Sequence, residues 1–226
     1  LYIASFSNLW REKCKTTSLF IPVLRDSIMI SVGGFLGRAT TYAEKLLLFP
    51  MLGGSAVSIY FASSIFGKII SMGISPITSV LLSYLAKIEH KPTKVFKIML
   101  LIVGFAGLIG YGTILVISGP ALRLLYPEFA AEAAVLVPLT AIATILTIFI
   151  SVVNAFILRF QRMQWQIYIN LISSVVLVIA SLTLTQHFGL RGFCVALIIV
   201  DIVKLGISLF VFMQKKKNEG FADTLC

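Results

Sequence analysis

The sequence predicts an all-α integral membrane protein, a bundle of six transmembrane helices. Hydrophobic residues make up 58% of the chain, charged residues only 12%, and the mean hydropathy is +1.00. Soluble domains carry about a quarter charged residues. Six stretches reach the roughly 20 residues that a helix needs to cross a hydrocarbon core about 30 Å thick. The loops between these stretches alternate between rich and poor in Lys and Arg.

The six spans are predicted, in chain order, at residues 27–49, 56–86, 98–118, 133–158, 167–186 and 192–213. Apolar runs such as VLVPLTAIATILTIFI do not alternate in polarity, which argues against the strands of about ten residues that form a membrane β-barrel. The spans form one lobe at 19–214. A basic cytoplasmic linker or interfacial segment at 1–18 precedes it, and a polar cytoplasmic tail at 215–226 follows it.

Turn-forming residues separate the spans. Pro50, Gly53 and Gly54 are expected to break the chain after the first span. The sequence KIEHKPTK turns it after the second, and GPALRLLYPEFAAEAA is the longest connection. RFQRMQW and HFGLRG supply the last two turns. Short loops of this kind predict antiparallel neighbours, and hence three helical hairpins.

The net charge of +10 is explained by topology. If the N-terminal segment is cytoplasmic, thirteen basic residues lie in the cytoplasmic segments and only Arg123 and Arg191 lie outside. That asymmetry is typical of multi-pass proteins of the cytoplasmic (inner) membrane, and it places both ends of this chain in the cytoplasm. We therefore expect membrane lipids around the protein and no nucleic-acid partner. The chain begins at Leu1 without a methionine, which suggests the latter part of a longer protein.

A polar stripe runs along the first span. Its members are spaced by three or four residues, which places them on one helical face: Ser27, Ser31, Gly34, Arg38, Thr41 and Lys45. Tyr42 flanks the stripe, and Glu44 is next to Lys45. A charge near the bilayer centre costs at least about 2.5–3.5 kcal/mol, so Arg38 is expected to face water or the bundle interior.

The second and fourth spans carry polar stripes of the same spacing, and the fifth has a weaker one of Gln166, Asn170, Ser173 and Ser174. The second has Ser64, Lys68, Ser71, Ser75 and Thr78, and the fourth has Thr140, Thr144, Thr147, Ser151 and Asn154. In the sixth span, Asp201 and Lys204 are three residues apart and able to pair. Hydroxyl groups in membrane helices commonly bond to their own backbone or to a neighbouring helix, so a structural role for the uncharged stripe is the competing interpretation.

Arg38 and Lys68 lack a carboxylate partner in their own helices. They either line a water-accessible cationic cavity or form internal ion pairs, such as Arg38 with Asp201. A cationic cavity predicts an anionic ligand, and guanidinium and ammonium groups suit a phosphate. The expected lining includes Ser31, Thr41, Tyr42, Ser64, Ser71, Thr144, Ser151 and Asn154, with Asp201 and Glu44 available for ion coupling. The three cysteines show no metal-binding spacing, and we expect no cofactor and no metal site.

Three segments together resemble the polysaccharide flippases of the multidrug/oligosaccharidyl-lipid/polysaccharide exporter superfamily. The first carries Glu44-Lys45, Tyr60, Ala62, Pro76 and Leu82-Ser83. The second, LRLLYPEFAAEAAVLVPL, has Pro127 where the family usually has glycine. The third, HFGLRGFCVALIIVDIV, resembles the entry to a final helix.

The resemblance covers roughly residues 15–214. It implies one lobe, the C-terminal six helices, of a transporter with twelve or more helices. It also implies that a lipid-linked oligosaccharide is flipped for surface polysaccharide synthesis (O-antigen of lipopolysaccharide, capsule or exopolysaccharide) and that Arg38 and Lys68 attract its diphosphate. The missing N-terminal half would supply the other wall of the cavity.

Other functions compete with this one. A cation-coupled drug antiporter of the same superfamily needs acidic residues in the cavity, and Asp201 is the best placed. A membrane enzyme is disfavoured because the chain has no HExxH or GxSxG motif and no pair of mid-span aspartates. A non-transporting scaffold would have a dry interior.

Overall fold

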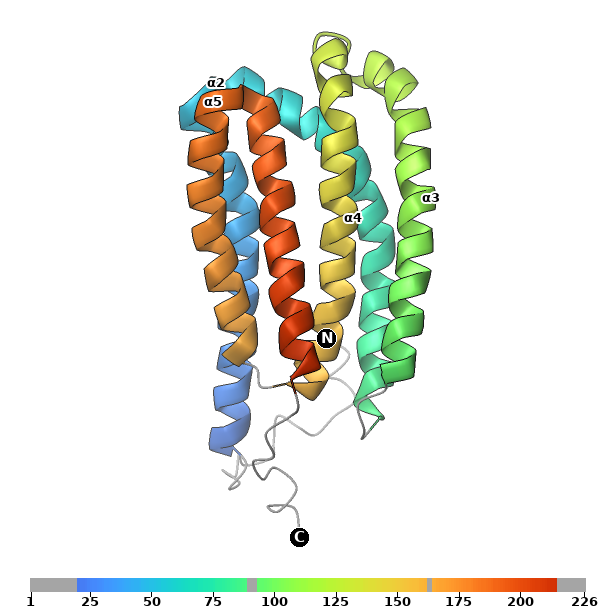
Figure 1. The fold of residues 1–226 in the computed structure, drawn as a ribbon, viewed down its shortest axis with the longest axis vertical. Helices are drawn as coiled ribbons and strands as arrows, with labels where there is room; N and C mark the ends of the chain where they lie inside the picture. The colour runs from blue at the N-terminus through green and yellow to red at the C-terminus, as the bar shows by residue number, and fades with distance from the viewer. Residues whose placement is uncertain (1–19, 89–92, 162–163, 215–226) are drawn as a thin grey trace, which may run out of the picture.

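The computed structural model describes residues 20–88, 93–161 and 164–214, and this part of the chain is almost entirely helical (Figure 1). It contains four helices: α2 (Phe20–Ala86), α3 (Thr93–Leu125), α4 (Ala130–Phe160) and α5 (Gln164–Met213). Each is long and apolar enough to cross a membrane. The predicted segments 1–18 and 215–226 lie outside the described residues.

The helix count differs from the prediction, because two predicted turns do not end a helix. The 67-residue α2 covers both the 27–49 and the 56–86 span, and the 50-residue α5 covers the last two spans. Each is interrupted at one glycine of positive φ, Gly53 (φ 82°) and Gly189 (φ 57°), a conformation that residues with a Cβ rarely adopt. We call residues 20–52 and 54–86 the first and second arms of α2, and residues 164–188 and 190–213 those of α5.

The arms lie side by side in the bundle. The chain of α2 rises along one side, bends across one end and returns beside α3 and α4, while α5 folds back on itself near Gly189 (Figure 1). Contacts join α4 to every other helix and α2 to α5. The predicted long connection after residue 118 is mostly helical, since α3 continues through Pro120 to Leu125 and α4 begins at Ala130.

The apolar core is divided into two clusters along the length of the bundle. One contains Leu48, Tyr60, Leu136, Phe193 and their neighbours, and the other contains Leu85, Phe96, Phe156 and Phe212 with theirs. Three rings of the second cluster pack together, with centroids of Phe96 and Phe212 4.1 Å apart. In α2, α4 and α5, the stretches between the two clusters carry polar residues such as Lys68, Thr144 and Asp201. The fold therefore places a polar layer between two apolar ends.

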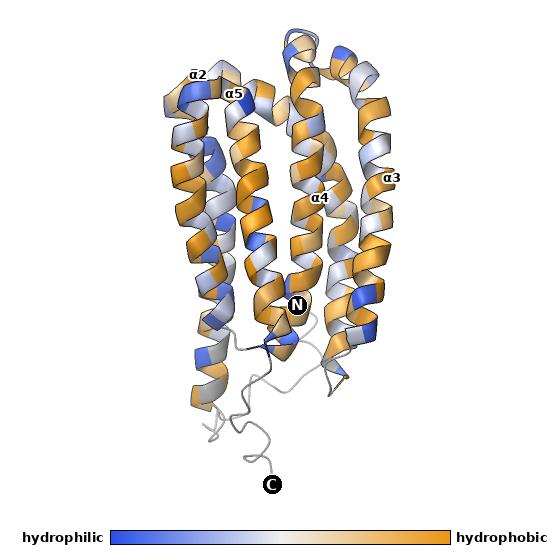
Figure 2. Ribbon diagram, viewed as in Figure 1, coloured by the Kyte–Doolittle hydropathy of each residue, from blue (hydrophilic) through white to orange (hydrophobic). Residues whose placement is uncertain are grey.

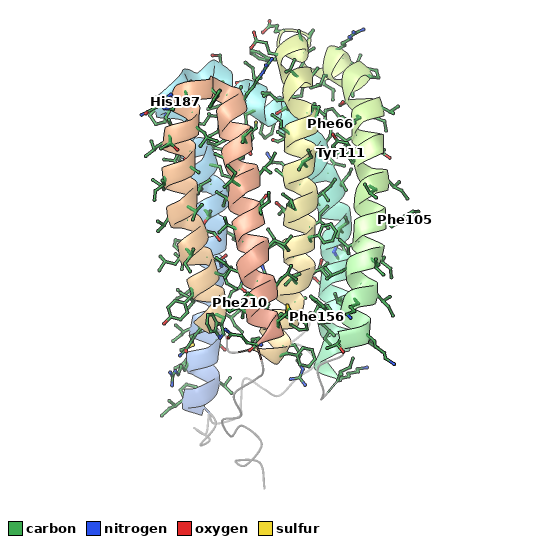
Figure 3. All side chains as sticks on the ribbon, in the orientation of Figure 1. Phe66, Phe105, Tyr111, Phe156, His187 and Phe210 are labelled. Carbon is green, nitrogen blue, oxygen red and sulfur yellow. The ribbon has the colours of Figure 1, made fainter. Side chains whose placement is uncertain are left out.

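Most of the outer surface is apolar along the helices (Figures 2 and 3). Large side chains such as Leu101, Phe105 and Leu108, on one face of α3, are 73%, 68% and 73% exposed. Soluble proteins rarely leave contiguous apolar patches of this extent in water. The exposed helix faces therefore fit a protein embedded in a membrane.

Small residues bring the first arms of α2 and α5 close together. A Cβ added at Gly33 would lie 3.1 Å from Cγ of Gln166, and one at Gly37 would lie 3.4 Å from Nδ2 of Asn170. The Nδ2 of buried Asn170 donates a hydrogen bond of 2.8 Å to the Gly33 carbonyl. The spacing of four residues between these glycines thus allows close packing of the two helix backbones.

Side chains at and just after the end of α4 donate hydrogen bonds to the C-terminal ends of α2 and α5. Arg159 donates to the carbonyls of Leu85 and Ile88, and Gln161, the residue after α4, donates to those of Val211 and Gln214. These bonds satisfy terminal carbonyls that have no partner within their own helix.

Candidate functional site

A polar cavity of about 250 Å³ lies between α2, α4 and α5, in the layer that separates the two apolar clusters. Two acidic and two basic side chains line it. Glu44 comes from the first arm of α2, Lys68 from its second arm, and Asp201 and Lys204 from the second arm of α5. The bend of α2 and the reversal of α5 are what bring these helices around one space.

Glu44 is held by a residue of the other arm of α2. The hydroxyl of Tyr60 donates a hydrogen bond of 3.2 Å to Oε2 of Glu44. Tyr60 itself is buried, 6% exposed, and its ring packs edge-to-face on Phe193 with centroids 5.4 Å apart. The contact fixes the carboxylate at the wall of the cavity and joins the two arms of α2.

Two ammonium groups flank one aromatic ring near the cavity. Nζ of Lys68 lies 4.6 Å from the centroid of the Phe61 ring, and Nζ of Lys45 lies 5.6 Å from it. Lys68 also donates a hydrogen bond of 3.1 Å to Oγ of Ser64. Because Phe61 is 39% exposed, this pair of cations is accessible from the surface of the bundle. An aromatic face stabilises a neighbouring cation by about 0.5–2 kcal/mol, depending on its solvation.

Asp201 faces α4. The hydroxyl of Thr147 lies 3.2 Å from Oδ2 of Asp201 and 3.0 Å from the carbonyl of Ala143, so its single proton is shared between two acceptors. Lys204 lines the same cavity one turn further along α5. Two carboxylates and two ammonium groups balance in formal charge at this cavity.

The structure brings most of the predicted site residues together. Seven line this cavity: Thr41, Glu44, Ser64, Lys68, Ser71, Thr144 and Asp201. Ser151 and Asn154 line a neighbouring groove. Arg38, Ser31 and Tyr42 are not among the residues that line either space; all three are exposed on the first arm of α2. The stripes of the second and fourth spans therefore face each other, whereas the stripe of the first span faces outward.

The outward stripe meets the cavity at one residue. Thr41 is exposed and also lines the cavity, and Arg38 precedes it by one turn on the same face. Ser27, Ser31 and Gly34 continue the exposed stripe toward the start of α2. The mouth of the cavity and the exposed guanidinium therefore share one side of the bundle.

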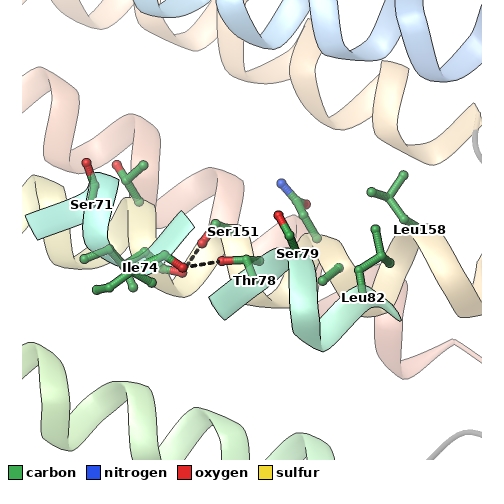
Figure 4. Close-up of a pocket in the computed structure, with 11 residues that line it drawn as sticks. Ser71, Ile74, Thr78, Ser79, Leu82, Ser151 and Leu158 are labelled. Atoms are coloured by element: carbon green, nitrogen blue, oxygen red, sulfur yellow. Dashed lines mark hydrogen bonds between the residues drawn. The ribbon is translucent and has the colours of Figure 1, made fainter. Parts of the chain in front are cut away.

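A groove of about 330 Å³ extends the cavity between the second arm of α2 and α4 (Figure 4). Ser71 and Thr147 line both spaces. From there the groove passes Thr78 and Ser151 and reaches Leu158, near the end of α4. The two facing stripes thus place polar groups along the cavity and the groove, from Tyr60 to Asn154, among apolar neighbours such as Ile74.

Four residues of the site were not predicted to lie there. Lys45 and Lys204 were expected only in a stripe and in a charge pair, Tyr60 only in the family resemblance, and Phe61 in neither. Tyr60 extends the stripe of Ser64 and Lys68 by one turn, a spacing that could have identified it. Lys45 and Phe61 come together only through the bend of α2, and the contribution of Lys204 depends on the reversal of α5. Among residues 20–88, 93–161 and 164–214, no group of three His, Cys, Asp or Glu side chains is placed to hold a metal ion.

The fold and the site define a helical protein with an apolar exterior and a charged cavity between its helices, arranged for a membrane. Comparison with protein-family models, with curated proteins and with solved structures finds no match for this chain.

Proposed function

We propose that this chain is one lobe of a transporter that flips a polyprenyl-diphosphate-linked oligosaccharide across the cytoplasmic membrane by alternating access. The observation that carries the proposal is the exposed polar stripe with Arg38 on the first arm of α2, whose other outward residues between Ile28 and Phe49 are apolar apart from Tyr42. A guanidinium facing hydrocarbon at this depth is costly, so the stripe has to face water or protein. A second lobe opposite the stripe would enclose a cavity there.

The arms of α2 and α5 would each cross the membrane, which gives six spans with both ends of the chain in the cytoplasm. The basic residues support this orientation, since Lys87, Lys94, Lys97 and Arg159 are all exposed at the end of the bundle where α2 and α4 finish. The bends at Gly53 and Gly189 would then lie at the outer surface.

The diphosphate would bind at the cavity mouth rather than within the lobe. A space of about 250 Å³ is small even beside the roughly 300–1,000 Å³ of pockets that enclose drug-sized ligands. Arg38 on the stripe and the Lys45 and Lys68 pair around Phe61 would supply three cations on one side of the lobe. The resemblance of the loop and helix-entry motifs to polysaccharide flippases supports the same substrate class.

Transport of a labelled polyprenyl-diphosphate oligosaccharide by the complete protein in liposomes tests the proposal. We expect Arg38→Ala and Lys68→Ala to reduce the rate by about tenfold or more, equivalent to about 1.4 kcal/mol each. Arg38→Lys should retain part of the rate. Arg123→Ala, which removes an exposed cation far from the stripe, is the matched control. Unchanged transport in both alanine variants would contradict the proposal.

A cation-coupled antiporter is the second candidate, favoured by the two carboxylates, Glu44 and Asp201, in one cavity. Carboxylates held by hydroxyl donors between helices are typical of proton and sodium pathways. Under this alternative, Asp201→Asn abolishes the dependence of transport on an ion gradient, and a small organic cation, rather than a lipid, is the substrate. Gradient dependence that persists in Asp201→Asn would reject this coupling role.

A further inference from the structure

Three hydroxyl groups that line the groove between the second arm of α2 and α4 already donate their protons within their own helices (Figure 4). Ser71, Thr78 and Ser151 donate to carbonyls of their own helices at 2.9, 3.2 and 2.7 Å. A hydroxyl that donates in this way keeps its oxygen lone pairs. The lone pairs that remain accept hydrogen bonds or coordinate cations, and they cannot donate to an anion.

A side-chain amide adds an acceptor oxygen that receives no hydrogen bond. Oδ1 of Asn154 is buried and has no hydrogen-bond partner, and Asn154 lines the groove. Leaving a buried polar atom unpaired costs about 1–3 kcal/mol, and in folded proteins a bound water or ion commonly pairs such an atom. The position therefore calls for a water or cation that enters the groove.

The groove leads from the charged cavity to one end of the bundle. Thr147, Ser151, Asn154 and Leu158 follow one face of α4 over 11 residues, a rise of about 16 Å. At its inner end Thr147 contacts Asp201, and at its outer end α4 finishes at Phe160 beside exposed Lys87. A row of acceptor groups among apolar side chains thus leads from a carboxylate to the end where the basic residues gather.

We propose that this groove is a hydrated entry path by which a small cation, hydronium or an alkali ion, reaches Glu44 and Asp201 from the end of the bundle that carries Lys87 and Lys94. The inference rests on the proposed membrane bundle but not on the identity of the transported substrate. Lys87 and Lys94 at the mouth would repel a cation approaching from solution. Both are exposed, however, and their long side chains can keep the ammonium groups in solvent away from the groove. Inside the groove, the lone pairs of Ser71, Thr78 and Ser151 and the unpaired Oδ1 of Asn154 favour a cation over an anion.

Sided cysteine labelling of the complete protein in sealed vesicles tests the path. In a background with Cys14 and Cys226 changed to Ser and Cys194 to Ala, Ser151→Cys and Asn154→Cys should react with a cationic methanethiosulfonate added at the Lys94 side. The reaction with an anionic reagent of similar size should be about tenfold slower, after each rate is divided by that of exposed Lys94→Cys, because charge discrimination strengthens in a partly desolvated groove.

Leu101→Cys, on an exposed apolar face of α3, is the control for a lipid-facing site and should not react. The proposal would be overturned if both reagents fail to label Ser151→Cys and Asn154→Cys, as they fail with Leu101→Cys. That result would show that lipid or protein fills the groove. Equal normalised rates for the two reagents would overturn the cation selectivity. The labelling reaction does not depend on transport. A negative labelling result would therefore not contradict the flippase proposal, and a negative transport result would not contradict the entry path.

Discussion

At Gly67 the second arm of α2 lies so close to α4 that no side chain fits. A Cβ there would overlap the side chain of Thr144, which also lines the cavity. Gly73, on the same arm, has open space around an added Cβ and is exposed. The two glycines therefore differ in packing while they share a helix.

We predict that Gly67→Ala destabilises the bundle by about 1–3 kcal/mol, as overpacking does, whereas Gly73→Ala is neutral or slightly stabilising because alanine favours helix. Thermal unfolding of both variants in detergent measures the difference. Equal midpoints for the two variants would mean that α2 and α4 do not touch at Gly67.

Asn170 is the corresponding residue between the first arms. Its amide joins α5 to the carbonyl of Gly33, and the hydroxyls of Thr40 and Ser174, one turn further along, lie 2.7 Å apart. Asn170→Leu removes the bond and places a larger apolar group against Gly37. We expect a loss of about 1–3 kcal/mol from this buried site, measured by denaturation in mixed micelles. Thr183→Val, at an exposed hydroxyl of the same arm, should change little.

At the scale of the element, the bend of α2 depends on one glycine. Gly53 has φ 82°, whereas its neighbour Gly54 does not have positive φ, and a Cβ at Gly54 makes only an ordinary 3.8 Å contact with Phe49. Gly53→Ala should cost about 1–3 kcal/mol through backbone strain, and Gly54→Ala should be tolerated. The two variants differ by one position, so unfolding midpoints that change equally would refute the role of Gly53 as the hinge of the two arms.

Hydrophobic patterning was enough to predict helices and their approximate bounds, because apolar runs of 20 or more residues leave few alternatives. It predicted a complete break between helices where the chain leaves helical geometry at one glycine only, Gly53 or Gly189. Pro50 and HFGLRG are turn signals that a helix end and a single-residue kink share. Helical spacing also identified the stripes of Lys68 and Thr144, because residues three or four apart share a face whatever the tertiary structure.

The spacing could not tell which face is buried. The stripe of Arg38 and the stripe of Ser71 have the same periodicity, yet the first is exposed and the second lines the interior. Which helix packs on which depends on contacts far apart in sequence, such as Thr140 to the Ser63 carbonyl at 3.0 Å. The proximity of Lys45 to Phe61 likewise follows from the bend at Gly53.

At the scale of the whole molecule, the two bends decide the topology. If each arm crosses the membrane, Ser55 and His187 lie on the side opposite to Lys94. We expect impermeant maleimide to label Ser55→Cys and His187→Cys from outside intact cells and Lys94→Cys only after the membrane is opened. Labelling of all three from one side would contradict six spans.

The central claim is that the polar stripe of α2 faces water inside the membrane rather than lipid. Thr41 and Ala39 are two residues apart on the first arm, at similar depth, and both are exposed on the lobe, but they point to different sides of the helix. In the complete protein, the account predicts that Thr41→Cys reacts with a water-soluble thiol reagent while Ala39→Cys, facing hydrocarbon, does not. Protection of Thr41→Cys equal to that of Ala39→Cys would contradict it.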